Sequence, residues 1–316
     1  MNKDEELLKV TFAQLYGQHQ AVELLKSAII NNRLAPGYLF AGPAGIGKGL
    51  AAKCFSQLLM GDNPLNKKRL QAGNHPDFLW VMPTYLHQGQ LLTPTEATAA
   101  GLKRKAPPQI RIEQVREITQ FLSSTPLEAP RAVVVIEDAQ KMAESAANAL
   151  LKTLEEPGKA TIILIAPGSD SLLPTLVSRC QRIPFYRLNE GEMKRVLQEK
   201  GYEEILTHRE LLMMAAGSPG EAIASFTQLQ AMPPILLEKF KKVPSNPHDA
   251  LTLAKEVDKT LDTEAQLWLI EYLQHFYWEK MQKKEIIEQL EKARQCLLSY
   301  VQPRLVWECT LLAVIQ

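Results

Sequence analysis

The chain has 316 residues, a length that fits two or three domains of ordinary size. With 46% hydrophobic residues, 22% charged residues and a formal net charge of +1, it is neither a polyelectrolyte nor a protein that wraps nucleic acid with its whole surface. The acidic start Met1–Glu6 lacks an apolar signal core, and no run of about 18 apolar residues is present. The four cysteines have no paired spacing, so the sequence predicts a reduced cytoplasmic protein.

The first predicted elements lead up to a glycine-rich segment. Apolar residues recur at helical spacing over residues 20–31, and a short apolar strand follows at 38–40. The segment GPAGIGKG at 42–49 comes next, and a second helical pattern runs from there to about residue 60. This order of strand, glycine loop and helix is the arrangement that a phosphate-binding loop needs.

The glycine-rich segment departs from the phosphate-loop template at one position. In the template, glycines allow backbone N–H groups to surround phosphates, a lysine balances their charge, and a Ser or Thr hydroxyl holds Mg²⁺. Gly49 stands at the hydroxyl position, so a magnesium ion would lack one of its ligands here. The candidate contacts to nucleotide phosphates are Gly42, Gly45, Gly47, Lys48 and Gly49.

A strand and a long connection follow the second helix. The apolar run 78–81 predicts a strand, and His75 and Asp77 before it favour a turn over a metal site because no third ligand is nearby. Residues 83–108 have no sustained period and predict a mobile surface insertion. The basic triplet Lys103–Lys105 fits a contact to a phosphate backbone or, as its charge count favours, a solvated loop.

An acidic pair closes the next strand. A helical stripe over residues 112–122 leads to the apolar run 132–136, which predicts a strand buried on both faces. Glu137 and Asp138 follow directly. P-loop ATPases place acids here to hold Mg²⁺ and to orient the attacking water, in the order Asp then Glu. The order is reversed in this chain, so the pair is interpreted as a degenerate acidic site, with simple strand-capping acids as an equal alternative on this pattern alone.

Four further segments resemble one protein family. They are FAQLYGQ at 12–18, AANALLKTLEEP at 146–157, the strand 161–165 and LPTLVSRC at 173–180. Together with the glycine loop they resemble the clamp-loader branch of the AAA+ ATPases, and the resemblance extends to about residue 200. It implies an α/β AAA+ P-loop domain with a parallel sheet between helices, then a small helical lid and an all-α collar. The expected boundaries are 1–186, 187–232 and 233–316.

The triplet Ser178-Arg179-Cys180 is the part of this resemblance with the largest consequence. In clamp loaders it presents an arginine to the ATP that the neighbouring subunit binds. A guanidinium suits that role because it is planar, always charged, and can stabilise charge developing on a transferring phosphoryl group. Without the flanking match, Arg179 would be assigned to a helix C-terminus. With the match, Arg179 is the candidate catalytic residue in trans, and Ser178 and Cys180 belong to its motif.

The departures from the family pattern are as informative as the matches. The polar sensor expected after the fourth strand falls on Ala166, and the arginine expected in the lid falls on Gly220. With Gly49 and the reversed pair Glu137 and Asp138, four parts of one catalytic apparatus are altered. The resemblance therefore implies a subunit that binds ATP or ADP without hydrolysing it.

The resemblance also implies partners and a place in replication. It predicts the stator subunit of a bacterial clamp loader, within the DNA polymerase III holoenzyme, in a heteropentamer with ATPase subunits and a clamp-opening subunit. The sliding clamp and primed DNA would be contacted through the complex, and no membrane is involved. Relatives often have a four-cysteine zinc module, but residues 61–75 contain no cysteine, so we expect a bare loop and no zinc.

An active AAA+ motor ATPase of clamp-loader type is the alternative to a non-hydrolysing subunit. In that case water would hold the magnesium ion in place of the missing hydroxyl. A nucleotide-dependent kinase fits less well, because nothing in the sequence resembles a site for an acceptor substrate.

Overall fold

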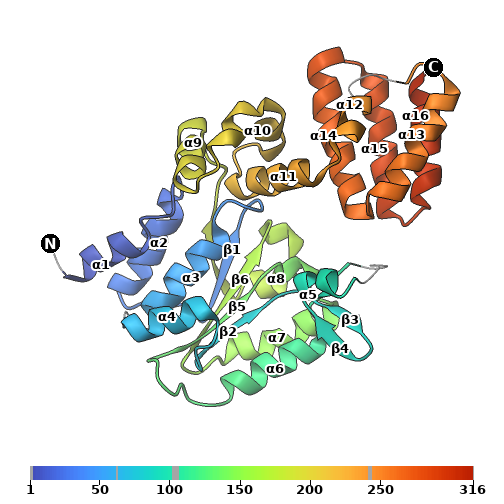
Figure 1. Cartoon of the computed structure of the whole chain (residues 1–316). Coiled ribbons are helices and arrows are strands. Elements are labelled where there is room, and N and C mark those ends of the chain that lie inside the picture. The colour runs from blue at the N-terminus through green and yellow to red at the C-terminus, as the bar shows by residue number, and fades with distance from the viewer. Residues whose placement is uncertain (1–2, 62, 102–106, 241–243, 316) are drawn as a thin grey trace. The chain divides into compact units, whose positions relative to one another are not determined.

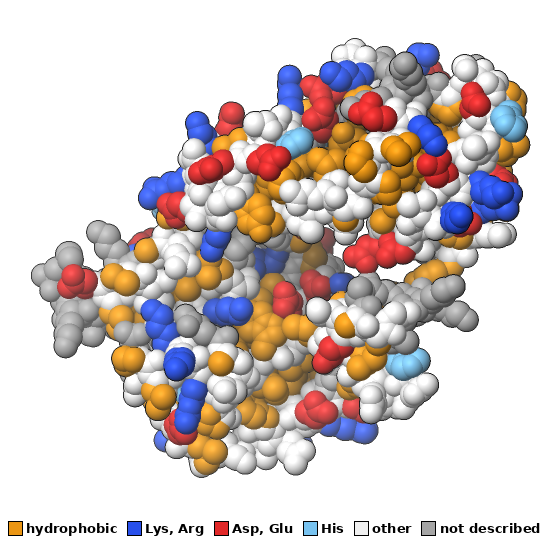
Figure 2. Space-filling view, in the orientation of Figure 1, with side chains coloured by type: hydrophobic (Ala, Val, Ile, Leu, Met, Phe, Trp, Pro, Cys, Tyr) orange, Lys and Arg blue, Asp and Glu red, His pale blue; other side chains and the backbone are white. Residues whose placement is uncertain are grey.

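The computed structural model describes residues 3–61, 63–101, 107–240 and 244–315, and Figure 1 shows the course of the chain. The chain divides into two compact units, residues 1–189 and 190–316. The triplet Lys103–Lys105 lies outside the described residues. Acidic and basic side chains are interspersed over the face drawn in Figure 2, in agreement with the formal net charge of +1. In the described ranges, no helix combines the length and apolar character needed to cross a bilayer.

The first unit is built on a five-stranded parallel sheet with the strand order β2-β5-β6-β1-β7. The three central strands are buried at every position, as their continuous apolar runs predict. The strands are β1 (Gly37–Ala41), β2 (Phe78–Val81), β5 (Ala132–Ile136), β6 (Ala160–Ala166) and β7 (Cys180–Pro184). The predicted strands at 38–40, 78–81, 132–136 and 161–165 and the α/β fold class are confirmed.

Alternate residues of the central strands point into two cores, one on each face of the sheet. Phe40 and Val135 belong to the core that α2 and α3 cover, whereas Leu39 and Val134 belong to the core that α6 and α7 cover (Figure 1). The helices described in this unit are α1 (Lys3–Thr11), α2 (His19–Ile30), α3 (Lys48–Leu59), α4 (Pro64–Ala72), α5 (Pro94–Ala99), α6 (Ile112–Leu122), α7 (Glu144–Glu155) and α8 (Pro174–Val177). Two 3₁₀ turns, η1 (Ala139–Lys141) and η2 (Ser169–Ser171), follow β5 and β6.

The expectation of a bare loop between residues 61 and 75 is wrong, because α4 lies there. Its two ends are defined by capping residues. The Asn63 side chain accepts the N–H of Leu65 at 3.0 Å, Pro64 takes the first helical position, and Gly73 ends the helix with a φ of 70°. The helix has almost no apolar stripe, so a search for hydrophobic periodicity does not find it.

The predicted surface insertion at 83–108 contains regular structure in its described part, although its sequence has no sustained period. The strands β3 (Tyr85–His87) and β4 (Gln90–Leu92) form an antiparallel hairpin. Its two turn residues, Gln88 and Gly89, have φ values of 49° and 82°, as a tight hairpin turn requires. The hairpin is followed by α5, whose start is closed by reciprocal hydrogen bonds between Thr93 and Glu96.

In its described residues, the second unit contains helices and no strands, and it has two hydrophobic clusters. The first is formed by α9 (Glu190–Glu199), η3 (Glu203–Thr207), α10 (Arg209–Ala215) and α11 (Pro219–Ala231). The second is formed by α12 (Pro234–Phe240), α13 (Pro247–Thr260), α14 (Thr263–Met281), α15 (Lys284–Leu298) and α16 (Pro303–Ile315). Trp268 and Tyr272 of α14 pack against both clusters. The division into a lid at 187–232 and a collar at 233–316 therefore stays a proposal.

Candidate functional site

The glycine-rich segment connects the carboxyl end of β1 to the first turn of α3. Gly45 and Gly47 have φ values of 69° and 99°, a backbone conformation that residues with a side chain rarely adopt. At Gly42 a Cβ atom would lie 2.4 Å from the carbonyl oxygen of Phe185, so no side chain fits there. The α3 N-terminus is preceded by Gly47, which supplies no side-chain cap, so the first N–H groups of the helix face the loop.

Lys48 is the first residue of α3, and its side chain folds back over the loop. The residue is 7% exposed, and its ammonium donates hydrogen bonds to the carbonyl oxygens of Gly42 and Pro43. This places the only side-chain charge of segment 42–49 against the backbone of that loop. The ammonium has three N–H donors, so it can bind a phosphate oxygen as well as the carbonyl oxygens of the loop.

Gln18, from the segment that resembles the family's N-terminal box, holds the loop from the other side. Its buried Nε2 donates to the carbonyl oxygens of Ile46 at 3.2 Å and of Tyr186 at 2.7 Å. Its Oε1 accepts the N–H of Tyr186 at 3.0 Å. One amide thus satisfies three backbone groups and joins the glycine loop to the chain that leaves β7.

The position of the missing hydroxyl faces an indole. A Cβ atom on Gly49 would lie 3.8 Å from Cη2 of Trp80, which is an ordinary van der Waals contact. Trp80 lies on the edge strand β2, and its Nε1 donates to Oε2 of Glu137 at 2.8 Å. Lys53 of α3 lies over the same ring, with its Nζ 5.4 Å from the ring centroid. From the sequence, Trp80 is predicted only as part of the strand 78–81.

The parallel register explains why Trp80 and Glu137 meet. Trp80 is paired with Val135 in the neighbouring strand β5, so the two side chains leave the sheet on the same face. Glu137 is two residues beyond Val135 and returns to that face by alternation. The strand pairing was the missing information, since 57 residues separate Trp80 from Glu137 along the chain.

Asp138 is directed into its own turn. Its backbone is left-handed, with φ 50° and ψ 48°, and it precedes η1. Its carboxylate accepts the ammonium of Lys141 at 2.7 Å and the side-chain amide of Gln140 at 3.3 Å. The two acids therefore have different partners. Glu137 accepts a hydrogen bond from Trp80, whose ring lies next to Gly49, whereas Asp138 is bound by residues of its own turn.

The two other positions that depart from the family pattern lack polar side chains in their structural setting. Ala166 ends β6 and is 1% exposed, and its carbonyl oxygen accepts the N–H of Gly42 at 3.2 Å. Gly220 lies in the first turn of α11, whose cap is the Ser218 hydroxyl accepting the N–H of Glu221 at 3.3 Å. Neither position offers a side-chain donor to a nucleotide.

Arg179 lies at the amino ends of the parallel strands, whereas the glycine loop lies at their carboxyl ends. It directly precedes β7, and Cys180 at the start of β7 pairs with Gly37 at the start of β1. The loop leaves the far end of β1, and a strand of five residues separates the two ends by about 16 Å. The candidate arginine is therefore directed away from the nucleotide loop of its own chain.

The guanidinium of Arg179 is held by residues of two neighbouring helices. Its Nε donates to Oε1 of Glu155 at 2.9 Å and its Nη2 contacts the same oxygen, while Nη1 donates to the carbonyl oxygen of Thr175 at 2.9 Å. Ser178 contributes a hydroxyl that donates to the same carbonyl at 3.1 Å. Burial raises the pKa of the Cys180 thiol to about 12, so this member of the triplet stays a neutral packing residue.

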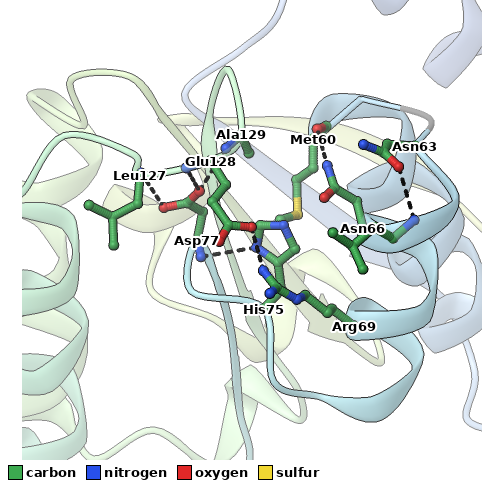
Figure 3. A network of polar contacts seen from close by, with 10 residues as sticks. Met60, Asn63, Asn66, Arg69, His75, Asp77, Leu127, Glu128 and Ala129 are labelled. Atoms are coloured by element: carbon green, nitrogen blue, oxygen red, sulfur yellow. Dashed lines mark hydrogen bonds and ion pairs between the residues drawn. The ribbon is translucent and has the colours of Figure 1, made fainter.

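His75 and Asp77 belong to a structural network, as favoured over a metal site. Figure 3 shows Asp77 with both carboxylate oxygens directed at the backbone N–H groups of residues 127–129, at 2.7 to 2.8 Å. Nδ1 of His75 accepts the N–H of Asp77 at 3.1 Å. Arg69 of α4 joins the network through an ion pair with Glu128 at 2.5 Å. No group of three or more His, Cys, Asp and Glu side chains positioned to hold a metal occurs among the described residues.

Two family models match this chain over nearly its whole length. Residues 17–189 match the model described as DNA polymerase III, delta subunit. Residues 191–314 match the model described as cyanobacterial DNA polymerase III delta prime, C-terminal domain.

Individual proteins give the same result at moderate identity. DNA polymerase III subunit delta′ of Bacillus subtilis is 36% identical over 180 residues, covering 54% of this chain and 48% of that protein. The Pseudomonas aeruginosa subunit delta′ is 34% identical over 199 residues, covering 58% of this chain and 54% of that protein. Each alignment thus spans about half the length of the relative. The Bacillus subtilis subunit tau is 28% identical over 211 residues, covering 62% of this chain and 34% of tau.

The structural comparison supports the fold. A DNA polymerase III gamma subunit-related protein from Thermotoga maritima superposes with a TM-score of 0.55 at 18% identity, covering 94% of this chain and 98% of that chain. The family models and the two delta′ subunits confirm the resemblance to clamp-loader proteins, and the tau match is at lower identity.

Proposed function

Because the chain belongs to the DNA polymerase III delta-prime family of clamp-loader AAA+ proteins, we propose that it is the stator subunit of a bacterial clamp loader. In this role it joins ATPase subunits and a clamp-opening subunit in a heteropentamer in the cytoplasm. The complex uses ATP to place a sliding clamp on primed DNA during replication. The chain contributes Arg179 to the ATP of a neighbouring subunit and hydrolyses no ATP itself.

The position of Arg179 is the observation that favours a role in trans. Arg179 lies at the amino ends of the strands, about one strand length from the glycine loop at their carboxyl ends. It is too far from its own loop to reach phosphates there, but it is 35% exposed in its side chain and available to a partner. Its guanidinium then stabilises charge on the γ-phosphoryl group of the neighbouring ATP.

The test is Arg179→Ala in the assembled complex, with DNA-stimulated ATP hydrolysis as the readout. ATP at the one affected interface should turn over about 10³-fold more slowly, so total turnover loses at least the share of that site. Arg182→Ala is the matched control, because Arg182 is an exposed arginine on β7 that is not part of the triplet. Unchanged ATPase in a complex of normal composition would rule out this role.

The proposal that the chain does not hydrolyse ATP is supported by the four altered positions. Gly49 and Gly220 have no side chain, Ala166 has no polar group, and Asp138 is paired with Lys141. The competing proposal, an active motor ATPase, predicts ATP hydrolysis by the purified chain that Lys48→Ala abolishes. We expect no such hydrolysis above the rate of a Lys48→Ala control.

A further inference from the structure

We propose that Trp80 closes the magnesium position of the glycine loop, so that the loop binds nucleotide phosphates without their metal ion. This inference rests on the proposed function, in which the loop holds nucleotide without hydrolysing it. It goes further because it assigns the exclusion of the metal to Trp80, which lies outside both the glycine loop and the acidic pair. It also predicts that magnesium does not tighten nucleotide binding.

The first step is the space beside Gly49. In a phosphate loop, the side chain at this position points its hydroxyl at Mg²⁺. Here ring carbons Cη2 and Cζ2 of Trp80 lie 3.8 and 4.0 Å from the Cβ position of Gly49. An apolar ring edge therefore faces the place where an oxygen ligand is needed. Magnesium demands near-octahedral oxygen coordination at about 2.0–2.1 Å and gives up its water reluctantly, so an apolar wall at this place is a poor site for it.

The second step is the carboxylate that should hold the ion. Oε2 of Glu137 accepts the indole N–H of Trp80 at 2.8 Å, a charge-assisted hydrogen bond in a half-buried setting. This hydrogen bond occupies one lone pair of Oε2 and holds the carboxylate beside the indole, so turning it toward a metal would leave the indole N–H without a partner. Asp138 offers no replacement, because its carboxylate is paired with Lys141 at 2.7 Å.

The third step is the ammonium of Lys53, which lies over the Trp80 ring. Lys53 is four residues after Gly49 on α3, so the two positions share a face of the helix. Its Nζ lies 5.4 Å from the Trp80 centroid. Lys53 is exposed, so its repulsion of a divalent cation beside Gly49 is screened by solvent and adds only weakly. The aromatic wall, the carboxylate held by the indole and this ammonium thus all disfavour a metal ion.

Phosphate binding itself does not need the metal in this arrangement. The Lys48 ammonium supplies a positive charge at the loop. The N-terminus of α3 supplies backbone N–H groups there. The charge that magnesium normally neutralises is partly supplied by these groups. Magnesium should therefore not tighten the binding of a nucleoside diphosphate, and should weaken it where the ion complexes the free nucleotide in solution.

The experiment measures ADP binding to the full chain by calorimetry, once with excess Mg²⁺ and once with a chelator. In the wild-type chain and in Gly49→Thr we expect magnesium to leave ADP binding unchanged or to weaken it, because excess Mg²⁺ complexes the free ADP in solution. In the double variant Gly49→Thr, Trp80→Leu we expect magnesium to tighten ADP binding about tenfold or more. Trp80→Phe with Gly49→Thr is the matched control, since it frees Glu137 but keeps an aromatic ring in the space and should gain little.

Two results would overturn the proposal. One is tighter binding with magnesium in the wild-type chain, and the other is a folded double variant without any magnesium-dependent binding. If Trp80→Leu disturbs folding, water-proton relaxation with Mn²⁺ and ADP tests the wild-type chain directly, because a manganese ion held on the protein enhances relaxation strongly. Such enhancement would contradict the proposal, and its absence while ADP binds would support it. The result is separate from the Arg179 test, which measures ATP on a different subunit.

Discussion

Arg179 and Glu155 form an ion pair within one chain, in which Nε of the arginine donates to Oε1 of the glutamate at 2.9 Å. Glu155 is the last residue of α7, and Arg179 lies between α8 and β7. The pair fixes the direction of the guanidinium at the amino edge of the sheet, together with the carbonyl oxygen of Thr175. The arginine proposed to act on a neighbouring ATP therefore has a defined orientation before any partner is present.

Glu155→Ala should lower the ATPase of the assembled complex less than Arg179→Ala does, because Thr175 still holds one end of the guanidinium. Glu155→Gln keeps an acceptor oxygen and should lie closer to wild type. The half-exposed pair contributes less than about 1 kcal/mol to the free energy of unfolding, so urea denaturation of Glu155→Ala should be nearly unchanged. The two losses should not add in the double variant, and additive losses would mean that Glu155 acts independently of Arg179.

Gly42 and Gly49 should respond oppositely to alanine, although both belong to the glycine loop. At Gly42 the new Cβ would lie 2.4 Å from a backbone oxygen and 2.9 Å from Cβ of Phe185, so Gly42→Ala should lower the free energy of unfolding by about 1–3 kcal/mol. At Gly49 the new Cβ meets only Trp80 at 3.8 Å, so Gly49→Ala should be neutral or stabilising by up to about 1 kcal/mol. Urea denaturation of the two variants measures both. Equal destabilisation would contradict the assigned contacts.

The sequence predicts the sheet well because its central strands are buried on both faces. A short apolar run rich in β-branched residues, such as 132–136, fits a strand that is covered on both faces. The glycine loop is equally predictable, since Gly45 and Gly47 serve a backbone conformation that few residues adopt. In both cases the local sequence contains the physical requirement.

The parts that could not be predicted depend on partners remote in sequence or on caps. The contact of Trp80 with Glu137 follows from the register of β2 on β5, which a single sequence does not reveal. The same holds for Glu155 and Arg179, which are 24 residues apart. In contrast, α4 has recognisable end signals in Asn63, Pro64 and Gly73, but its sequence lacks the hydrophobic periodicity that predicts most helices.

The half-buried thiols of Cys54 and Cys180 should react more slowly with alkylating agents than the exposed thiols of the folded chain. Burial raises their pKa values to about 11 and about 12, so the reactive thiolate is scarce at about pH 8. Cys296 and Cys309 are exposed and should be modified first. Peptide mass spectrometry after brief iodoacetamide treatment reads out the order, with urea-unfolded chain as the control in which all four react at similar rates. Early modification of Cys180 in the native chain would contradict its assigned burial.

Asp77→Asn should destabilise the first unit in a manner that depends on pH. Burial favours the neutral acid, but the N–H groups of Leu127, Ala129 and Glu128 outweigh it, and the pKa of Asp77 is lowered. A carboxyl whose folded pKa lies below its unfolded value of about 3.9 stabilises the fold above that value, and this contribution is lost as the pH falls through the folded pKa. Asparagine turns one oxygen into an amide that cannot accept, so at neutral pH the variant should lose about 1–3 kcal/mol. Urea denaturation at neutral pH and at successively lower pH should show the gap between wild type and variant closing only below about pH 4. A gap that is constant down to that range and beyond would mean that packing, and not the charge of Asp77, holds residues 127–129 in place.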